Sequence, residues 1–428
     1  MKKRAELFRY VGVDVAQDTL TGHYELDGRP FVERVSFEGI GPLSGPGVTA
    51  LAELWYVIAG LSYYKAGAAH AIDLGATRLG AQGRSLLRAA LRDGLGEYAY
   101  RNELDLDDVT ITGGTEVERC SPALDANRIL TPFGGGIDSV VTVSQLSDRL
   151  DQSLFIVSPL SGRFDSLEAT AAVTGLAVVR ATRAIDEQVL RGDDRFFNGH
   201  VPVTTMVTLL GALAAVASGR GGVAMSNEFS ASVPNLHWRG RPVNHQWSKS
   251  LDAEVLIGDA LAELVGDDLV VASFLRDRSE VWVAQAFARL HEYHGVFRSC
   301  NRAFTQESAR RASKWCGECD KCLFINLVLA PFLERAALRE IFGSEPLAQR
   351  ALEGRLRTLV GLGEQHKPFE CVGDPDESAV ALRAVSALPE WSDAPQLARI
   401  AASASPRRSL DELLESQGPR RVPAHWLR

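Results

Sequence analysis

The first 120 residues alternate between apolar and polar positions in a way that predicts strands, and then change to a helical period. A period of two is typical of half-buried strands, whereas apolar residues three or four apart are typical of helices. Strand alternation covers residues 8–15, 19–26 and 29–37, and helical spacing covers residues 47–67 and 84–95. With Asp27-Gly28 as a hairpin turn, we expect residues 1–120 to form an N-terminal α+β domain.

Short apolar runs and helical segments take turns from about residue 121 to residue 298. They predict strands at 128–133, 153–159, 176–182, 221–226 and 268–275, and helices at 138–150, 165–174, 201–218 and 251–264. This order predicts an α/β domain with a parallel sheet. Ligands of such sheets bind beyond the carboxyl ends of the strands, where this chain places glycine-rich and polar segments.

Residues 299–428 begin with clustered cysteines and continue with helical segments, of which residues 323–342 show the clearest helix. The cluster has the spacing Cys316-x2-Cys319-x2-Cys322. Tetrahedral zinc takes four ligands, and Cys300 is the best fourth, with Cys371 as a spare. Structural zinc, redox or sulfur-carrying thiols, and reduced core cysteines are three open interpretations. Cys120 is interpreted as an ordinary cysteine.

Composition and charge narrow the classes of function. The 428 residues carry 46 Lys and Arg against 54 Asp and Glu, a net charge of -8, with no basic tract. Because proteins that bind a phosphate backbone usually carry a basic stripe, nucleic acid is not an expected partner. We expect no signal peptide, and the clustered cysteines indicate a reducing cytoplasm. The uncharged run at 201–219 contains four hydroxyl side chains, so we expect a buried helix and no stable membrane insertion.

Three consecutive glycines stand between a predicted strand and a predicted helix in residues 129–146, ILTPFGGGIDSVVTVSQL. Consecutive glycines are costly to order, which indicates a functional reason for them. The backbone N–H groups of such a loop, together with the positive end of the helix dipole, favour a bound anion. The segment matches neither the Walker pattern nor GxGxxG. The alternative is a tight turn in which Asp138 and Ser139 cap the helix and no ligand binds.

Two further polar segments are expected at the same cleft. Residues 196–204 contain Asn198 and His200, and residues 223–250 contain Asn227, Glu228, Ser230, His237, Asn244 and His245. A histidine near a carboxylate can act as a general acid or base near neutral pH, although each histidine can equally be structural. Glu228 can instead hold Mg²⁺. Four arginines can bind carboxylates or phosphates, or can be solvated: Arg180, Arg183, Arg239 and Arg241.

The glycine segment resembles the SGGxDS loop of the N-type ATP pyrophosphatase (PP-loop) superfamily through Gly135, Gly136, Asp138 and Ser139. Gly134 stands where that motif has its first serine, so one hydroxyl contact is missing. The resemblance implies that residues 121–298 form a parallel, doubly wound PP-loop domain that binds ATP and Mg²⁺. It places the amides of Gly134, Gly135 and Gly136 and the Ser139 side chain at the phosphates, with Asp138 near Mg²⁺.

Two families within that superfamily combine the loop with a cysteine cluster. One is 7-cyano-7-deazaguanine synthase, which is much shorter. The other is the UDP-N-acetylmuramoyl-L-alanyl-L-glutamate epimerase family of peptidoglycan precursor synthesis, which this chain resembles more closely. The second resemblance runs through FRYVGVDVAQDTLTGHYELDGRPFVERVSF, GLGEYAYRN, PFGGGIDS, FNGHVPVT, SNEFSAS and WCGECDKC, and so covers most of the chain up to about residue 340.

The closer resemblance implies an ATP-dependent epimerase that converts the terminal L-glutamate of a UDP-linked muramoyl dipeptide to D-glutamate. An acyl-adenylate would form, and AMP and pyrophosphate would be released. Our candidates for the catalytic acid and base groups are His200, His245 and Glu228. Our candidates for substrate binding are Asn198, Asn227, Ser230 and Arg239, and the metal candidates are Cys300, Cys316, Cys319 and Cys322 with structural Zn²⁺.

Two other hypotheses belong to different functional classes. An ATP-dependent ligase or amidating enzyme would adenylate another carboxylate and pass it to ammonia or sulfur. A non-catalytic nucleotide-binding or zinc-scaffold protein would bind ATP without releasing pyrophosphate. The polar groups at the predicted strand ends favour an enzyme, and the resemblance along the chain favours the epimerase over the ligase. The sequence leaves the oligomeric state open.

Overall fold

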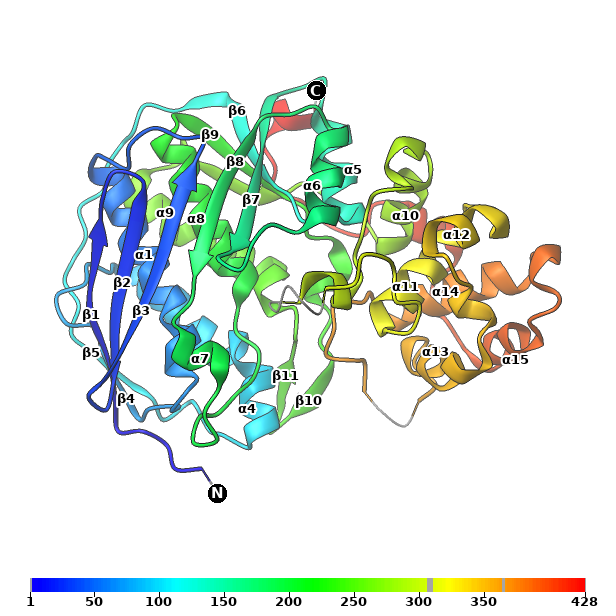
Figure 1. Ribbon diagram of the computed structural model, residues 1–428, viewed down its shortest axis with the longest axis horizontal. Coiled ribbons are helices and arrows are strands. Elements are labelled where there is room, and N and C mark those ends of the chain that lie inside the picture. The colour runs from blue at the N-terminus through cyan, green and yellow to red at the C-terminus, as the bar shows by residue number, and fades with distance from the viewer. Residues whose placement is uncertain (1, 306–310, 364–365, 428) are drawn as a thin grey trace.

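The computed structural model describes residues 2–305, 311–363 and 366–427, and within these ranges ten strands form one mixed sheet (Figure 1). In sheet order they are β12 (Val270–Ser273), β9 (Arg220–Met225), β6 (Asp125–Pro132), β7 (Asp151–Pro159), β8 (Val178–Ala184), β3 (Arg29–Glu38), β2 (Thr19–Leu26), β1 (Leu7–Val15), β4 (Ala71–Asp73) and β5 (Thr110–Thr112). The separate pair β10 (Leu236–Trp238) and β11 (Arg241–Val243) is antiparallel.

The sheet has two halves that meet at β8 and β3. Strands β12, β9, β6, β7 and β8 are parallel, which confirms the predicted parallel sheet. β8 pairs antiparallel with β3, and β3, β2 and β1 continue as an antiparallel meander. The sheet therefore runs without a break across the predicted boundary at residue 120. The division at residue 120 remains a prediction about folding units.

Helices cover both faces of the sheet (Figure 1). One core contains buried residues of α1 (Pro46–Ala59), α3 (Ala81–Ala89), α8 (Val203–Ala217) and α9 (Leu251–Val265). The other core contains buried residues of α5 (Ile137–Leu146), α6 (Asp165–Val173), α10 (Glu280–Ala288) and α11 (Asp320–Leu329). The uncharged run at 201–219 thus forms a buried core helix, as predicted. In the part of the chain that the structure describes, no helix has the length and apolar character needed to cross a bilayer.

The C-terminal part is helical and packs against the second core (Figure 1). Its helices after α11 are α12 (Arg335–Phe342), α13 (Glu353–Leu359), α14 (Pro375–Ser386), α15 (Pro395–Ser403) and α16 (Leu410–Leu414). The single helix predicted over 323–342 is wrong, because α11 ends at Leu329 and α12 starts at Arg335. Pro331 lies between them, and proline lacks the N–H that a continuous helix needs.

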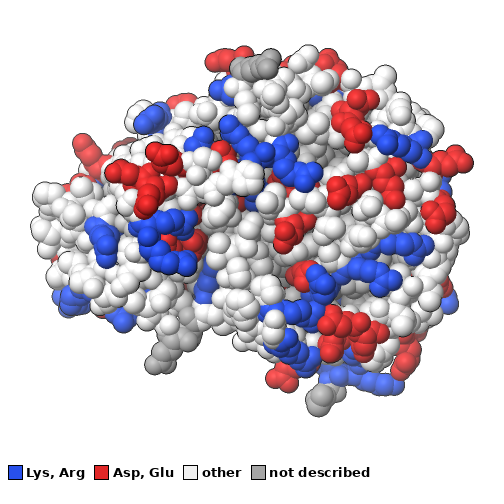
Figure 2. All heavy atoms as spheres, turned by 180° about the vertical axis from the view of Figure 1, so that it is seen from behind, with Lys and Arg blue, Asp and Glu red and all other residues white. Residues whose placement is uncertain are grey.

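The remaining short helices connect these elements. They are α2 (Leu61–Tyr64), α4 (Gly96–Asn102), α7 (Glu187–Arg191) and the turns η1 (Ala90–Gly94), η2 (Phe229–Ser232), η3 (Trp247–Lys249), η4 (His291–Tyr293), η5 (Asn301–Phe304), η7 (Pro346–Ala348), η8 (Arg350–Leu352), η9 (Pro389–Trp391) and η10 (Ala424–Leu427). Ser250 begins α9 by accepting a hydrogen bond from Ala253 N. Acidic and basic side chains are interspersed on the face shown in Figure 2.

Candidate functional site

The glycine loop joins the carboxyl end of β6 to the first turn of α5. Gly135 has a φ of +70°, a conformation that favours glycine, and Gly136 is the N-cap residue of α5. No side chain caps this helix, so the interpretation of Asp138 and Ser139 as capping residues is wrong. Ser139 Oγ instead donates to Gly136 O at 3.1 Å. The first N–H groups of the helix are therefore not taken by a side-chain cap.

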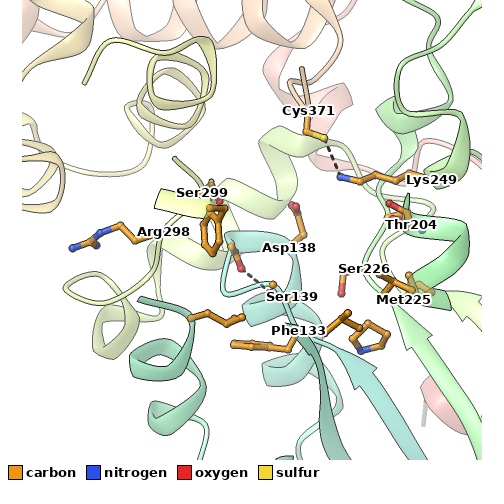
Figure 3. Close-up of a pocket in the computed structure, with 18 of the residues that line it drawn as sticks. Phe133, Asp138, Ser139, Thr204, Met225, Ser226, Lys249, Arg298, Ser299 and Cys371 are labelled. Carbon is orange, nitrogen blue, oxygen red and sulfur yellow. Dashed lines mark hydrogen bonds between the residues drawn. The ribbon is translucent and has the colours of Figure 1, made fainter. Parts of the chain in front are cut away.

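A cavity of about 410 Å³ opens above the glycine loop. Its apolar wall comes from the ends of the parallel strands and the helices beside them, and includes Phe133, Phe155, Val157, Leu167 and Met225. Its polar wall includes Asp138, Ser139, Ser226, Asn227, Lys249, Arg298, Ser299, Asn301, Lys321 and Cys371. Figure 3 shows Phe133 at one end of the cavity and Cys371 and Lys249 at the other, with Asp138 and Ser226 between them. The cavity thus lies beyond the carboxyl ends of the strands, as the sequence predicts.

Asp138 points into the cavity from the first turn of α5 (Figure 3). Its Oδ1 atom is buried and has no hydrogen-bond partner among the described residues. Burial, and then the charge of Glu228, raise the pKa of Asp138 to about 6 against the opposing charges of Lys321 and Lys249. A buried carboxylate oxygen without a donor is suited to a cation, because hard divalent cations take oxygen ligands.

Further carboxyl groups and lysines lie behind Asp138. Burial, and then the charge of Asp138, raise the pKa of Glu280 well above its usual value. Burial raises the pKa of Glu377 to about 8, and Glu377 Oε2 accepts a hydrogen bond from the Glu280 backbone at 2.8 Å. Burial lowers the pKa of Lys367. A buried cluster of this kind is costly to fold, and such clusters are typical of functional sites.

A second polar network reaches the cavity through Cys371. Lys249 Nζ lies 3.5 Å from Cys371 Sγ (Figure 3), and His245 interacts electrostatically with the same thiol. His245 Nδ1 is in short hydrogen-bonding contact with Glu97 Oε2. The ring of His200 lies against that of His245 in a tilted arrangement, with 4.2 Å between centroids and 41° between the ring planes. The network therefore links a thiol, an imidazole and a carboxylate in series.

Electrostatics favour the charged forms of Cys371 and His245 and the neutral form of His200. Burial raises the pKa of the Cys371 thiol, but the charge of Lys249 and the hydrogen bond to His245 outweigh it and lower the pKa to about 6. Burial lowers the pKa of His245, but the hydrogen bonds with Cys371 and Glu97 outweigh it and raise the pKa to about 9. Burial, and then the charge of His245, lower the pKa of His200 to about 4. At neutral pH, Cys371 is thus a thiolate beside imidazolium and ammonium groups.

The structure brings together part of the predicted site. Gly134, Gly136, Asp138, Ser139 and Asn227 line the cavity, and Gly135 shapes the loop. His245 does not line the cavity, but it interacts electrostatically with Cys371, which does. Among the residues that the structure describes, five other predicted site residues do not line the cavity: Asn198, His200, Glu228, Ser230 and Arg239.

Each of these five residues has other partners. Asn198 accepts a hydrogen bond from Lys65 Nζ at 3.2 Å, and Ser230 donates to Glu228 at 3.1 Å. Arg239 lies in the hairpin between β10 and β11, over the ring of Trp238. The ring of His200 contacts that of His245.

Two other predicted arginines are engaged within the fold. Arg180 pairs with Glu168 at 2.8 Å, and Arg183 pairs closely with the fully buried Glu33. Arg183 therefore joins β8 to β3 and is occupied by a structural partner.

Sequence reasoning missed Lys249, Arg298, Ser299 and Lys321 on the cavity wall, and it also missed Glu97. Lys321 lies inside the cysteine motif, and Arg298 and Ser299 directly precede Cys300. Lys249 lies in the polar segment 223–250, and Glu97 lies in the segment GLGEYAYRN. No spacing pattern shows which of these side chains reach the cavity or the network behind it. Cys371 was noticed only as a spare metal ligand, because a cysteine outside a spaced cluster gives no signal of its place in the fold.

Four cysteines form a separate cluster near the start of α11. The Sγ atoms of Cys300, Cys316, Cys319 and Cys322 all lie within 4.8 Å of one another. Cys316 and Cys322 are 3.6 Å apart, and Cys319 and Cys322 are 3.4 Å apart. Four thiolates around one zinc ion at about 2.3 Å would stand at similar separations. The cluster can hold a metal ion such as zinc, with Cys300 in the predicted fourth position and Cys371 outside the set.

Comparison with known proteins agrees with this two-part architecture, an α/β sheet followed by a helical part that share one cavity. A family model described as "MurL N-terminal domain" matches residues 1–274, and a second, described as "MurL C-terminal domain", matches residues 296–414. The chain belongs to the MurL family. The glycine loop and Lys249 lie in the first match, whereas Arg298, Lys321 and Cys371 lie in the second.

Three relatives carry the name UDP-N-acetyl-alpha-D-muramoyl-L-alanyl-L-glutamate epimerase. The protein of Salinispora tropica is 41% identical over 355 residues, covering 80% of this chain and 74% of the relative. The protein of a Micromonospora species is 40% identical over 349 residues, covering 80% and 76%. The protein of Xanthomonas oryzae pv. oryzae is 33% identical over 444 residues, covering 100% and 97%. The predicted family is confirmed. No solved structure matches this chain significantly.

Proposed function

We propose that this protein is an epimerase that inverts the terminal L-glutamate of UDP-N-acetylmuramoyl-L-alanyl-L-glutamate, giving the D-glutamate form used in peptidoglycan precursors. The observation that carries the proposal is the similarity to the Xanthomonas relative of that name, which extends over 100% of this chain. The cavity above the glycine loop supports it, because an anion-binding loop and several ionisable groups converge there.

The chemistry requires activation of the glutamate before its α-proton can leave. A free carboxylate is already negative, so a second negative charge at the neighbouring carbon is strongly disfavoured. We propose that ATP converts this carboxylate to an acyl-adenylate and that pyrophosphate leaves. The Cα proton is then acidic enough for a side-chain base, and the enolate-like intermediate is stabilised electrostatically. Water finally cleaves the adenylate, which releases AMP.

The glycine loop is the proposed site for the phosphates of ATP. The loop amides and Ser139 lie at the N-terminus of α5, where backbone N–H groups and the helix dipole favour anions. The buried and unpartnered Asp138 Oδ1 fits a ligand of Mg²⁺, with Glu228 near enough to act on the pKa of Asp138. A bound Mg²⁺ would supply charge neutralisation for the phosphate oxygens.

His200, His245 and Glu228 remain our candidates for the acid and base groups, and the structure supports them to different degrees. Among them, His245 is best supported as part of the acid–base network, because it interacts with Cys371 on the cavity wall, although it does not line the cavity itself. The charge of Glu228 raises the pKa of Asp138, whereas His200 lies beside His245, whose charge lowers the pKa of His200. Among the proposed substrate contacts Asn198, Asn227, Ser230 and Arg239, Asn227 has the strongest support because it lines the cavity.

The four-cysteine cluster is proposed to hold structural zinc. It lies at the start of α11, the helix that also carries Lys321 into the cavity. A metal there would fix the N-terminal end of this helix and so the position of Lys321. The proposed zinc has no role in proton transfer or in adenylation.

The experiment measures pyrophosphate release from ATP with the UDP-linked dipeptide, with and without ammonia. The epimerase predicts release that depends on the dipeptide and does not depend on ammonia. Release that needs ammonia, with an amidated product, would replace the epimerase by a ligase. ATP binding without any release would leave a nucleotide-binding protein.

A further inference from the structure

Cys371 lies on the cavity wall at the end of a series of interacting side chains. Its Sγ atom is 3.5 Å from Lys249 Nζ, and its thiol interacts electrostatically with His245, which in turn contacts Glu97. Figure 3 shows Cys371 and Lys249 together, on the side of the cavity away from Phe133. Of these four side chains, Cys371 and Lys249 line the cavity.

We propose that Cys371 is a catalytic residue of the epimerisation, the thiolate that takes the α-proton of the activated glutamate on one face, and that His245 and Glu97 are positioning residues that hold it charged. The proposal rests on the proposed function, because it needs an activated carboxyl group. It also gives a role to the half-buried His245 and the buried Glu97, which do not line the cavity themselves.

The proton transfer balances in two half-steps. In the first, the Cα–H bond breaks, an S–H bond forms at Cys371, and the electron pair moves to the carbonyl oxygen of the activated carboxyl group. In the second, that electron pair returns to form a new Cα–H bond with a proton from an acid on the opposite face. The Cys371 thiol then gives its proton to solvent, and the acid on the opposite face regains a proton from solvent, before the next turnover.

The surrounding charges support a thiolate at this position. Three cationic groups act on Cys371: Lys249, His245 and Lys321 all lower the pKa of the thiol against the effect of burial, to about 6. Asp138 is an anionic neighbour, and the charge of Cys371 raises the pKa of Asp138. The charge of Cys371 in turn is the main cause that raises the pKa of Lys249. A thiolate with a pKa near the working pH is both available as a base and able to release its proton.

A metal ion is a weaker explanation of the same residues. Ligand atoms of Glu97, His200 and His245 lie within 4.8 Å of one another, which is close enough for three ligands of one cation. However, His245 Nδ1 and Glu97 Oε2 are in direct hydrogen-bonding contact, whereas the four-cysteine cluster keeps separations of 3.4–3.6 Å. Direct contact leaves no room for an ion between the two atoms.

The test separates adenylation from proton transfer in the full-length variants Cys371→Ala and Cys371→Ser, with Cys120→Ser as the matched control. ATP–pyrophosphate exchange with the UDP-linked dipeptide reports adenylation. Incorporation of deuterium from D₂O at the glutamate Cα, measured by mass spectrometry, reports proton transfer. We expect both Cys371 variants to keep exchange and to lose deuterium incorporation by on the order of 10²–10⁴-fold. Cys120→Ser should keep both.

Two results would overturn the proposal. One is deuterium incorporation by Cys371→Ala within about threefold of the unchanged protein, far below the loss expected for a general base. The other is equal loss of exchange and deuterium incorporation in both folded variants, which would assign Cys371 to nucleotide binding. Failure of the proposed function has a different signature, namely no dipeptide-dependent exchange in the unchanged protein.

A second measurement does not depend on turnover and tests the positioning residues. The rate of alkylation of Cys371 by iodoacetamide is followed against pH in the unchanged protein, in His245→Gln and in Glu97→Gln. We expect a thiolate titration that moves to higher pH in both variants, with alkylation near pH 6.5 slower by about tenfold in His245→Gln. An unchanged titration in both variants would contradict the assignment of His245 and Glu97.

Discussion

The backbone of Gly135 lies against Leu167, so that a Cβ at residue 135 would stand 3.1 Å from Leu167 Cδ1. The φ of Gly135 is also +70°, in the left-handed region. The glycine loop therefore combines a close approach to α6 with a conformation that other residues adopt at a cost. This relationship fixes the path of the loop below the cavity.

Gly135→Ala should disturb the loop without unfolding the protein. We expect a cost of about 1–2 kcal/mol for the left-handed alanine, and a fall of at least about tenfold in pyrophosphate release. Gly175→Ala is the matched control, because Gly175 has a φ of +66° and a Cβ there would meet nothing within 4 Å. The control should lose a similar amount of stability and keep its turnover. Equal turnover in the two variants would remove the loop from the site.

Asp138→Asn should raise the stability of the fold and lower the activity. The pKa of Asp138 is raised to about 6 in the folded protein, so its charged form destabilises the fold at pH values above that pKa. We expect the free energy of unfolding at about pH 8 to rise by on the order of 1–3 kcal/mol, and the gain to disappear below about pH 4. Chemical denaturation at the two pH values measures it.

The same variant should lose pyrophosphate release by at least about 10²-fold, because the proposed Mg²⁺ ligand loses its charge. Asp148→Asn is the control, since Asp148 is exposed just beyond α5. A stabilised Asp138→Asn protein with unchanged turnover would refute the assignment of Asp138.

Cys319→Ser should remove the metal and weaken the C-terminal part. We expect one zinc ion per chain in the unchanged protein by elemental analysis, and none in the variant, with a lower Tm. Cys371→Ser should keep the zinc, because Cys371 lies outside the four-cysteine set. A protein purified without stoichiometric zinc would contradict the structural-zinc proposal, and zinc loss in Cys371→Ser would contradict the choice of Cys300.

Glu33→Gln should destabilise the sheet where its two halves meet. Glu33 is fully buried and neutralises Arg183, so the variant leaves a buried guanidinium without its partner. We expect a loss of about 3–5 kcal/mol in the free energy of unfolding. Glu25→Gln is the control, because the Glu25–Arg9 pair is partly exposed and contributes at most about 1 kcal/mol. A single cooperative transition in both variants would show that the two halves unfold together.

Local patterns predicted the parallel strands, the glycine loop and the four-cysteine cluster, because each depends on neighbours in sequence. The pairing of β3 with β8 depends on residues about 150 positions apart, as in Glu33 and Arg183, and no local pattern reports it. The apolar spacing of residues 323–342 predicted one continuous helix, although Pro331 lies in the break between α11 and α12.

The candidate site, too, was predicted only where a local motif marks its residues. Asp138 and Ser139 were found because the loop motif names them, whereas Cys371, Lys249 and Glu97 carry no motif. His245 and Glu97 are 148 positions apart in the sequence and are in contact in the fold. The residues next to His245 in the sequence therefore could not predict its environment. Tertiary contacts, which decide the pKa of these groups, are the part that sequence patterns leave undetermined.

The central claim is that ATP is consumed to invert a carbon centre. The most direct measurement incubates the purified protein with ATP, Mg²⁺ and UDP-N-acetylmuramoyl-L-alanyl-L-glutamate, without ammonia, and determines AMP, pyrophosphate and the chirality of the glutamate released by hydrolysis. We predict D-glutamate formed together with stoichiometric AMP. AMP formation with glutamate that stays entirely L would contradict the account.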